Sequence, residues 1–288
     1  SSRRRHTRYI SVTGVQTCAL PILWLGESGE NSNVWFRDAI ALVERHGIGW
    51  AFWPLKKIGF NNPYEIVPNP GWAKLVAYWT GKGPSPSADE AYATLMQLAR
   101  HDIRHENNVF HADVVDAMLR QPHDPSARPS APLQITAEGG TFDAVDYDIG
   151  PLGVAYFDID NANYHVSTGK DRTLWNNGRT WRNDGVDIAR AEDESLYVSD
   201  FKPGEWMRYS LSADGGGSYG LEIELRSEKG GALALTVNGT PFSLDAPAGA
   251  KWQRLRVPAR VTLLDGNNLL VLASKGFDGS VRTVRFAP

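Results

Sequence analysis

Cysteine is nearly absent from this sequence of 288 residues, in which Cys18 is the single example. A disulfide needs two cysteines, thiolate catalysis needs a reactive one, and cysteine-based zinc sites need several. Because Cys18 lies in an unusual N-terminal segment, the residues that follow it can form none of these. The redox state of the protein's compartment is left open.

Two further features are missing, an excess of basic residues and a long apolar run. The 30 Lys and Arg residues are matched by 33 Asp and Glu residues, which gives a net charge of −3 and a pI near 6.2. An acidic balance offers no general surface for nucleic acid. No run approaches the ~18 apolar residues of a membrane-spanning helix. We therefore expect neither a nucleic acid nor a membrane as partner.

Tryptophan, by contrast, is abundant, with ten residues beside ten Tyr and ten Phe. Trp buries a large apolar area in protein cores, and its flat face also stacks on the C–H face of a pyranose ring. Core packing is the alternative for any single Trp. Several of them lie in Asn- and Gly-rich stretches typical of loops, which favours a carbohydrate ligand.

The first 22 residues show no pattern of a folded protein. Arginines at positions 3–8 could belong to a signal peptide, but Thr13 and Gln16 interrupt the apolar region that such a peptide requires. A basic arm for nucleic acid is a second interpretation. The third is that "VTGVQTCALPI", residues 12–22, resembles a translated sequencing-library adapter. We expect residues 1–22 to be such an artefact, joined where upstream coding sequence was lost.

Residues 23–120 alternate between strand and helix patterns. "ILWLGE" and "IGWAFW" are short apolar runs, and the apolar residues from Phe36 to Val43 recur between them at helical spacing. Strand, helix and strand in this order predict a βαβ unit with parallel strands. Further helices are expected at "GWAKLVAYW", after the capping box "SADE", and at "HADVVDAMLR".

The pattern changes after "QPHDPSARPSAP", which holds four prolines and predicts an interdomain linker at residues 121–133. Beyond it, "YGLEIELRS" alternates apolar and charged residues as a half-buried strand does. "ALALTVNGTPFSL" reads as two strands around Asn238-Gly239, a strong hairpin signal. Short strands between Gly-rich turns predict an all-β jelly-roll sandwich over residues 134–288.

Glu27 ends the first strand pattern and is followed by the turn formers Ser28 and Gly29. In a (β/α)8 barrel, catalytic groups lie at the carboxyl ends of the strands, where side chains from several strands converge. An ordinary solvated carboxylate is the alternative, and position alone favours it.

Three stretches carry a family resemblance, "WLGESGENSNVWF", "GIGWAFWPLKKIGFNNPYEI" and "HADVVDAMLRQ". In order and spacing they resemble the last part of cellulase-type enzymes of glycoside hydrolase family 5. The resemblance implies that residues 23–120 are the last two strands and helices of a (β/α)8 TIM barrel. It also implies that Glu27 is the nucleophile of a retaining β-glycosidase of the endo-β-1,4-glucanase type, and that Trp53 forms the floor of the sugar subsite.

A retaining glycosidase needs a second carboxyl group, about 5–5.5 Å from the nucleophile, to protonate the leaving oxygen. In the family this acid/base glutamate precedes the seventh strand, and this sequence has no counterpart of it. We therefore expect the chain alone to lack glycosidase activity. The alternative to an enzyme fragment is a non-catalytic carbohydrate-binding protein. Neither needs a cofactor for catalysis.

The C-terminal part carries a second resemblance in "GVAYFDIDNANY", "WRNDGVDIARAED", "KPGEWMRYSL" and "GFDGSVRTVRF". These stretches are similar to carbohydrate-binding module family 6, which implies a β-sandwich that holds β-glucan or xylan between two aromatic rings. The residues that match the family's binding positions are Trp181, Arg182, Trp252 and Asp278. Where the family has Asn, Asp278 only accepts hydrogen bonds, which leaves the preferred sugar open. Packing at the edge of the core is the alternative for both tryptophans.

Many members of that family also hold a structural calcium ion, and Glu138 matches one of its ligands. Ser280 stands where a second acidic ligand is common, and one carboxylate is a weak site for a cation that takes 6–8 oxygens. Calcium is therefore an open expectation. A β-linked polysaccharide partner, glucan or xylan, implies a secreted protein, although no export signal is visible.

Overall fold

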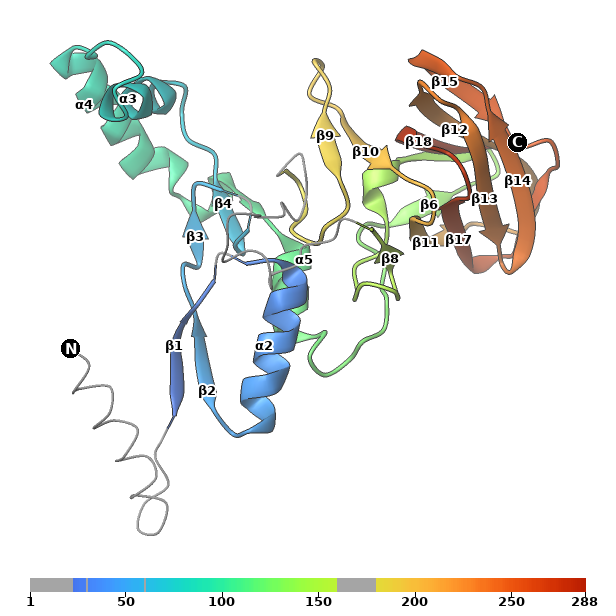
Figure 1. The fold of residues 1–288 in the computed structure, drawn as a ribbon, viewed down its shortest axis with the longest axis horizontal. Coiled ribbons are helices and arrows are strands. Elements are labelled where there is room, and N and C mark those ends of the chain that lie inside the picture. The colour runs from blue at the N-terminus through green and yellow to red at the C-terminus, as the bar shows by residue number, and fades with distance from the viewer. Residues whose placement is uncertain (1–22, 30, 60, 160–179) are drawn as a thin grey trace, which may run out of the picture.

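The computed structural model describes residues 23–29, 31–59, 61–159 and 180–288, so the adapter-like segment 1–22 lies outside the described residues. The helices and short strands of the N-terminal part lie on one side of the molecule, and the β-sandwich lies on the other (Figure 1). Among the described helices, none combines the length and the apolar character needed to cross a bilayer.

The N-terminal part begins with a strand, a helix and a strand, as predicted. β1 (Trp24–Ser28) pairs in parallel with β2 (Gly49–Phe52), and α2 (Asn33–Arg45) connects them. Ser32 caps α2 with its side chain, and Gly47 follows the helix at a φ of 65°. Within the described residues no third strand pairs with β1 or β2.

The remaining N-terminal elements are small. The capping box is confirmed, because Ser87 and Glu90 exchange hydrogen bonds at the start of α4. Apolar side chains of α4 stay uncovered: Tyr92 is 67% exposed and Leu95 is 42% exposed, because α3 and α4 pack on each other and project away from the rest (Figure 1). The elements are β3 (Lys56–Lys57), β4 (Tyr64–Ile66), α3 (Gly71–Trp79), α4 (Ala88–Gln97), the π-helical turn η1 (Leu98–Asp102), the 3-10 turn η2 (His105–Asn107), β5 (Asn108–Phe110) and α5 (Ala112–Leu119).

The core of the N-terminal part is small and lies between α2 and α5. Its buried residues within the described chain are Phe36, Ile40, Val114, Ala117 and Met118. The ring of Phe52 from β2 meets that of Phe36 edge-on, with centroids 5.2 Å apart. This packing fixes the position of α5, whose Asp113 and Asp116 contact Asn183 and Arg128.

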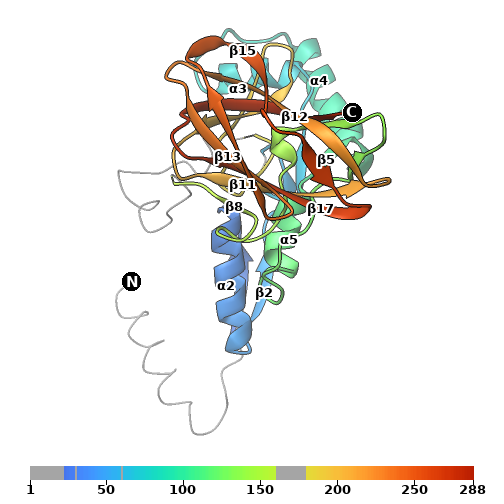
Figure 2. The ribbon, with the colours of Figure 1, turned by 90° about the vertical axis from the view of Figure 1, so that its right-hand side faces the viewer.

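Two mostly antiparallel sheets form the sandwich, and Figure 2 shows their strands from the side opposite to α3 and α4. The first sheet has the order β15 (Gly249–Arg256), β12 (Gly217–Ser227), β18 (Gly279–Ala287), β10 (Leu196–Phe201) and β9 (Ile188–Arg190), with β16 (Val261–Leu263) beside β12 and β7 (Gly140–Asp143) beside β18. The second has the order β14 (Thr240–Ala246), β13 (Gly231–Val237), β17 (Gly266–Ser274), β11 (Trp206–Ala213) and β6 (Leu133–Ile135), with β8 (Tyr156–Phe157) beside β11. The 3-10 turn η3 (Ala144–Asp146) follows β7.

The sandwich core follows the alternation read from the sequence. On β12, Leu221, Ile223 and Leu225 are fully buried, while the charged residues between them point outward. The hairpin between β13 and β14 turns at Asn238 (φ 51°) and Gly239 (φ 82°), both in the left-handed region that this turn requires. The predicted β-sandwich and its hairpin are confirmed.

The proline-rich stretch between the two parts is anchored to both. The backbone N–H and carbonyl of Arg128 bond to Ile149 at 2.9 and 2.8 Å. The guanidinium of Arg128 lies 2.7 Å from the buried carboxylate of Asp116 on α5. Asp116 also pairs with Arg120 through two contacts of 2.7 Å. The stretch therefore ties α5 to the start of the sandwich.

Candidate functional site

The strand ends that carry Glu27 and Trp53 lie side by side. The N–H of Trp53 donates to the carbonyl oxygen of Ser28 at 2.9 Å. A Cβ on Gly29 would lie 1.8 Å from the Trp53 carbonyl oxygen, so this approach requires glycine. Glu27 is exposed and Trp53 is 56% exposed. Both residues thus stand open to solvent at the carboxyl edge of the β1–β2 pair.

A buried polar network joins the N-terminal part to the sandwich, with Asp113 of α5 at its centre. The Asp113 carboxylate accepts hydrogen bonds from the Asn33 side chain at 2.7 Å and from the Asn183 N–H at 2.8 Å. The Asn183 side chain donates to the Asn33 side chain at 2.9 Å and to the Asn31 carbonyl at 2.8 Å. Asp113, Asn33 and Asn183 are all buried. The network fixes the loop 181–184 against α2 and α5.

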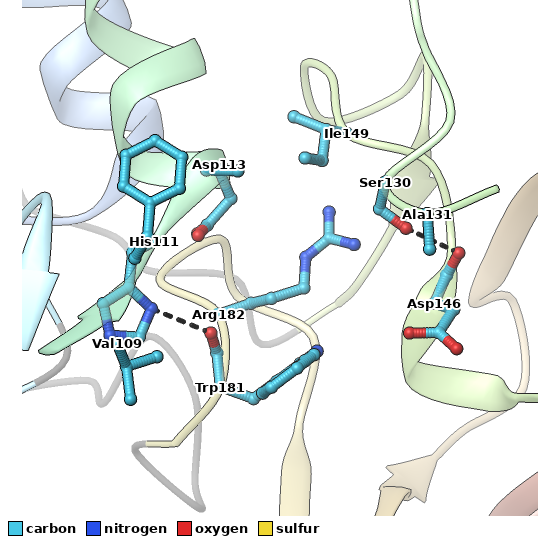
Figure 3. A pocket seen from close by; sticks show the side chains of 11 residues that line it. Val109, His111, Asp113, Ser130, Ala131, Asp146, Ile149, Trp181 and Arg182 are labelled. Carbon is cyan, nitrogen blue, oxygen red and sulfur yellow. Dashed lines mark hydrogen bonds between the residues drawn. The ribbon is translucent and has the colours of Figure 1, made fainter. Parts of the chain in front are cut away.

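A pocket of about 360 Å³ opens at this junction (Figure 3). Its walls are mainly apolar and come from both parts of the chain. Phe110 and Trp181, which are 51% and 39% exposed, supply its aromatic surface. The N-terminal part contributes Val109, Phe110, His111, Ala112 and Asp113, and the remaining lining is Ser130, Ala131, Asp146, Ile149, Trp181 and Arg182.

Trp181 holds an unusual backbone conformation at the edge of this pocket. Its φ of 70° lies in the left-handed region, which a bulky side chain rarely adopts. The Trp181 carbonyl accepts a hydrogen bond of 3.1 Å from His111 Nδ1, drawn as a dashed line in Figure 3. Such strain persists where neighbouring contacts over-determine the backbone, and it clusters at ligand sites.

Arg182, the next residue along the chain, also holds the Trp181 backbone in place. Its guanidinium donates to Asp184 at 2.7 Å, to the Tyr147 carbonyl at 2.5 Å and to the Asp148 carbonyl at 3.0 Å. The guanidinium carbon also lies 3.7 Å from the centroid of the Tyr147 ring. Arg182 is only 4% exposed, so it anchors the loop and offers little surface to a sugar.

The pocket's titratable groups have shifted pKa values. Burial by itself would lower the pKa of His111, but the hydrogen bond to Glu65 and the negative charges of Asp113 and Glu65 raise it overall. Burial raises the pKa of the Asp146 carboxyl, and the negative charge of Asp143 adds to this. Asp146 lies opposite Trp181 in Figure 3 and can accept hydrogen bonds from a ligand.

Trp252 lies elsewhere, on the outer face of the first sheet. Its ring meets that of Tyr197 edge-on, with centroids 5.3 Å apart. The guanidinium carbons of Arg226 and Arg282 lie 4.7 and 5.2 Å from the Trp252 ring centroid. These four residues line an open hollow of about 470 Å³ together with Arg190, Ala191, Glu192 and Asp193.

A second hollow of about 570 Å³ adjoins the first one, because Arg226 lines both. Asp278 lies in this second hollow, paired with Lys229. The hydrogen bond from Lys229 and the charge of Asp278 raise the pKa of the Lys229 ammonium. Trp252 and Asp278 therefore belong to one continuous surface over the sheet face.

Glu138 lies in an exposed turn before β7, where its carboxylate accepts a hydrogen bond of 2.9 Å from the Thr136 hydroxyl. That hydrogen bond lowers the pKa of Glu138. In the described ranges, no three His, Cys, Asp or Glu side chains gather as a metal site would require. These donors fit calcium poorly, and the calcium site stays a prediction.

The structure thus groups the residues suggested for carbohydrate binding and catalysis into three places, and Glu138 lies apart from them. Trp181 and Arg182 meet at the junction pocket, Trp252 and Asp278 lie on the sheet face, and Glu27 with Trp53 lies at the β1–β2 edge. The two tryptophans expected to flank one cleft line different pockets.

Several residues of these sites were missed from the sequence. Phe110 and His111 reach the junction pocket from the N-terminal part, which nothing local to the sandwich sequence could indicate. Arg226 and Tyr197 looked like ordinary strand residues. A signal for Arg226 was available, because it is one of the outward charges of "YGLEIELRS".

Carbohydrate-binding modules are among the solved structures that this chain resembles. No family model and no curated protein matches the chain. Among solved structures, it resembles the C-terminal CBM6 of a marine laminarinase from Zobellia galactanivorans, with 21% identity over 36% of this chain and 88% of that one, at a TM-score of 0.32. A CBM6 from Clostridium stercorarium in complex with cellobiose matches with 9% identity over 55% and 98% of the two chains, at a TM-score of 0.38.

A cycloalternan-forming enzyme from Listeria monocytogenes, in complex with a pentasaccharide substrate, matches with 21% identity over 36% of this chain, at a TM-score of 0.32. The match spans only 11% of that enzyme's length. The structural neighbours thus include carbohydrate-binding modules and carbohydrate-active enzymes, at low coverage.

Proposed function

We propose that this chain binds a β-linked polysaccharide, a glucan or a xylan, through its β-sandwich. The observation that carries the proposal is Trp181, whose partly exposed ring is held at a φ of 70° beside a mainly apolar pocket of about 360 Å³. An indole face offers a pyranose ring an apolar surface to stack on. The pocket's volume lies within the usual range for small-ligand sites, about 300–1,000 Å³.

The polar groups around Trp181 suit hydroxyl groups. The Trp181 indole N–H has no hydrogen-bond partner among the described residues and can donate to a sugar oxygen. The Asp146 carboxylate can accept from a sugar hydroxyl. Because Arg182 and His111 are already engaged with protein acceptors, they hold the Trp181 backbone in place before the sugar arrives. A preorganised aromatic surface loses little conformational freedom on binding.

The N-terminal part supports a second, finer proposal, that residues 23–120 belong to the barrel of a retaining β-glycosidase. Glu27 and Trp53 lie at adjacent strand ends, as a nucleophile and the floor of its subsite would. Hydrolysis with retention needs an acid/base carboxyl about 5–5.5 Å from the nucleophile. We propose that this chain alone binds but does not hydrolyse, so that in isolation it acts as a non-catalytic carbohydrate-binding protein. A polysaccharide ligand also favours an extracellular location.

Affinity electrophoresis of the whole chain in gels containing soluble β-glucan or xylan tests the binding proposal. We expect one of these polysaccharides to retard the chain, and Trp181→Ala and Trp252→Ala each to weaken retention about tenfold. Trp79→Ala, which removes a 56% exposed Trp on α3, is the matched control. Equal mobility with and without polysaccharide would exclude the function, and unchanged retention in both variants would exclude these surfaces.

Activity is measured separately, as reducing-sugar release from the same polysaccharides. We expect none, and Glu27→Gln should bind as the parent chain does, since Glu27 lies outside both binding surfaces. Turnover by the purified chain that disappears in Glu27→Gln would show that a complete catalytic pair is present.

A further inference from the structure

Arg226 occupies a central position on the outer face of the sandwich. Its guanidinium carbon lies 5.0 Å from the Tyr197 ring centroid and 4.7 Å from that of Trp252. One of its terminal nitrogens donates to the Tyr197 hydroxyl at 3.1 Å. Two rings and one hydrogen bond therefore hold the guanidinium in a fixed orientation, and Arg226 lines both hollows of this face.

The other cations around the two hollows each face a carboxylate. Arg282 pairs with Asp193 at 3.1 Å, Arg190 lies 3.7 Å from Glu194, and Lys229 pairs with Asp278. Arg226 differs, because among the described residues no carboxylate lies within ion-pair distance of it. A guanidinium fork matches a carboxylate geometrically, and both hydrogen bonds of such a pair are charge-assisted.

We propose that Arg226 is a subsite for the carboxylate of a uronic acid residue, so that the polysaccharide bound by this chain carries acidic sugars. The inference rests on the proposed function and names its ligand more closely. The uronic acid ring would lie against the Trp252 and Tyr197 rings, while its carboxylate meets the free donors of Arg226. Neighbouring sugars would then extend into the hollows on either side.

The charges at the rims restrict how many acidic sugars the ligand carries. Asp193 and Asp278 are already paired with Arg282 and Lys229. Glu192 at the first hollow and Glu228 at the second lie in no ion pair among the described residues. These carboxylates repel further negative charge on the bound chain. The surface therefore selects a neutral β-linked backbone with isolated uronic acid residues over a continuous polyuronate.

Isothermal titration calorimetry with the whole chain tests this, using three oligosaccharides of matched length. These are xylohexaose, xylohexaose bearing a single glucuronic acid branch, and a hexamer of β-linked glucuronic acid. We expect the singly branched ligand to bind about tenfold more tightly than the neutral one and more tightly than the hexuronate. The preference should shrink in 0.5 M NaCl, because salt screens a partly exposed ion pair.

Arg226→Gln should remove the preference for the branched ligand over the neutral one, measured as the ratio of the two affinities, and Arg226→Lys should keep part of it, since lysine keeps the charge but loses the fork. Arg285→Gln is the control, because Arg285 pairs with Glu222 at 3.3 Å on the same strand pair and lines neither hollow. Equal affinity for neutral and branched ligands in the parent chain, or a preference that survives in Arg226→Gln, overturns the inference while the proposed function stands. No binding of any saccharide, polymers included, overturns both.

Discussion

A hydrogen bond of 3.1 Å joins the imidazole Nδ1 of His111 to the backbone carbonyl of Trp181, across the junction between the two parts of the chain. The other ring nitrogen of His111 lies 3.0 Å from the Glu65 carboxylate. Both partners are acceptors, whereas a neutral imidazole carries a single N–H. Both bonds can therefore form only when His111 is an imidazolium, which places a positive charge at the buried junction.

Stability of the junction should depend on pH through this residue. The pKa of His111 is raised in the folded chain: burial would lower it, but Glu65 and Asp113 outweigh burial. A raised pKa stabilises the fold fully below the unfolded value of about 6.5, and this contribution is lost as pH rises through the folded pKa. We expect the unfolding free energy to fall as the pH rises above about 6.5, and His111→Gln to remove that decline. An NMR titration of the His111 ring measures the pKa directly.

Glu205 is a second buried group that titrates near the pH range of His111, so its effect on stability must be separated from that of His111. Burial raises the pKa of Glu205 to about 7, although the backbone N–H groups of Lys202 and Ile159 oppose the shift. The stability that Glu205 contributes is lost between about pH 4.5 and 7, mostly below the pH range in which His111 loses its proton. Measuring the decline in a Glu205→Gln background isolates His111. A His111 pKa at or below 6.5 in the folded chain would contradict the imidazolium assignment.

Asp113 should be the most sensitive position of the junction network. Replacing it with Ala leaves the Asn33 amide and the Asn183 N–H buried without their acceptor. Each unsatisfied donor costs about 1–3 kcal/mol, so Asp113→Ala should lower the unfolding free energy by about 2–4 kcal/mol. Urea unfolding measures this. Asp245→Ala, on an exposed site of β14, should stay within about 0.5 kcal/mol, and an equally small effect of Asp113→Ala would show that the two parts do not depend on this network.

The proline-rich stretch should resist proteolysis because of one ion pair. Arg128 lies 2.7 Å from Asp116, whose carboxylate is buried on α5. Arg128→Ala should therefore free residues 121–132 and raise the rate of cleavage there several-fold in limited proteolysis, since cleavage follows local opening. Arg104→Ala, which removes an exposed arginine 4.0 Å from Glu106, is the matched control. Equal cleavage rates would show that the backbone bonds to Ile149 and the bonds from Arg120 to the Asp124 and Ser126 carbonyls hold the stretch without the ion pair.

The sequence predicted the parts of the fold that depend on local patterns, such as the alternation of apolar and polar residues along a strand. The alternation of β12 and the Asn238-Gly239 turn predicted the strand and the hairpin, because both depend on neighbouring residues alone. The capping box at Ser87 was visible for the same reason. The apolar face of α4 was also visible, but whether anything covers it depends on distant residues, and Tyr92 stays exposed.

The site was less predictable, since it depends on contacts between distant residues. Trp181 was found by its family resemblance, yet its partner at the pocket is His111, 70 residues away, rather than Trp252. Arg182 was expected to bind sugar, and the structure buries it in an ion pair instead. No periodicity reveals that two strand residues, Tyr197 and Arg226, meet on one face, because their register comes from the sheet order.

Arg182 should stabilise the fold rather than bind sugar. All three of its nitrogens donate to protein oxygens, and its closest charged partner, Asp184, is as deeply buried as Arg182 itself. Removing one member of a buried ion pair leaves the other uncompensated, which typically costs about 3–5 kcal/mol. Arg182→Ala should therefore lower the unfolding free energy by that amount in urea unfolding. Arg182→Lys should also be clearly destabilising, because an ammonium cannot reach three acceptors arranged around a planar fork.

Comparing Arg182→Ala with Trp181→Ala distinguishes a residue that stabilises the fold from one that binds the polysaccharide. Trp181→Ala removes a partly exposed ring, so it should change stability by about 1 kcal/mol or less while weakening polysaccharide retention. If Arg182→Ala instead leaves stability unchanged and abolishes retention, the guanidinium contacts the sugar directly, and the loop 181–184 must open to release it. The buried bonds to Asp184, Tyr147 and Asp148 argue that stability is what this arginine determines.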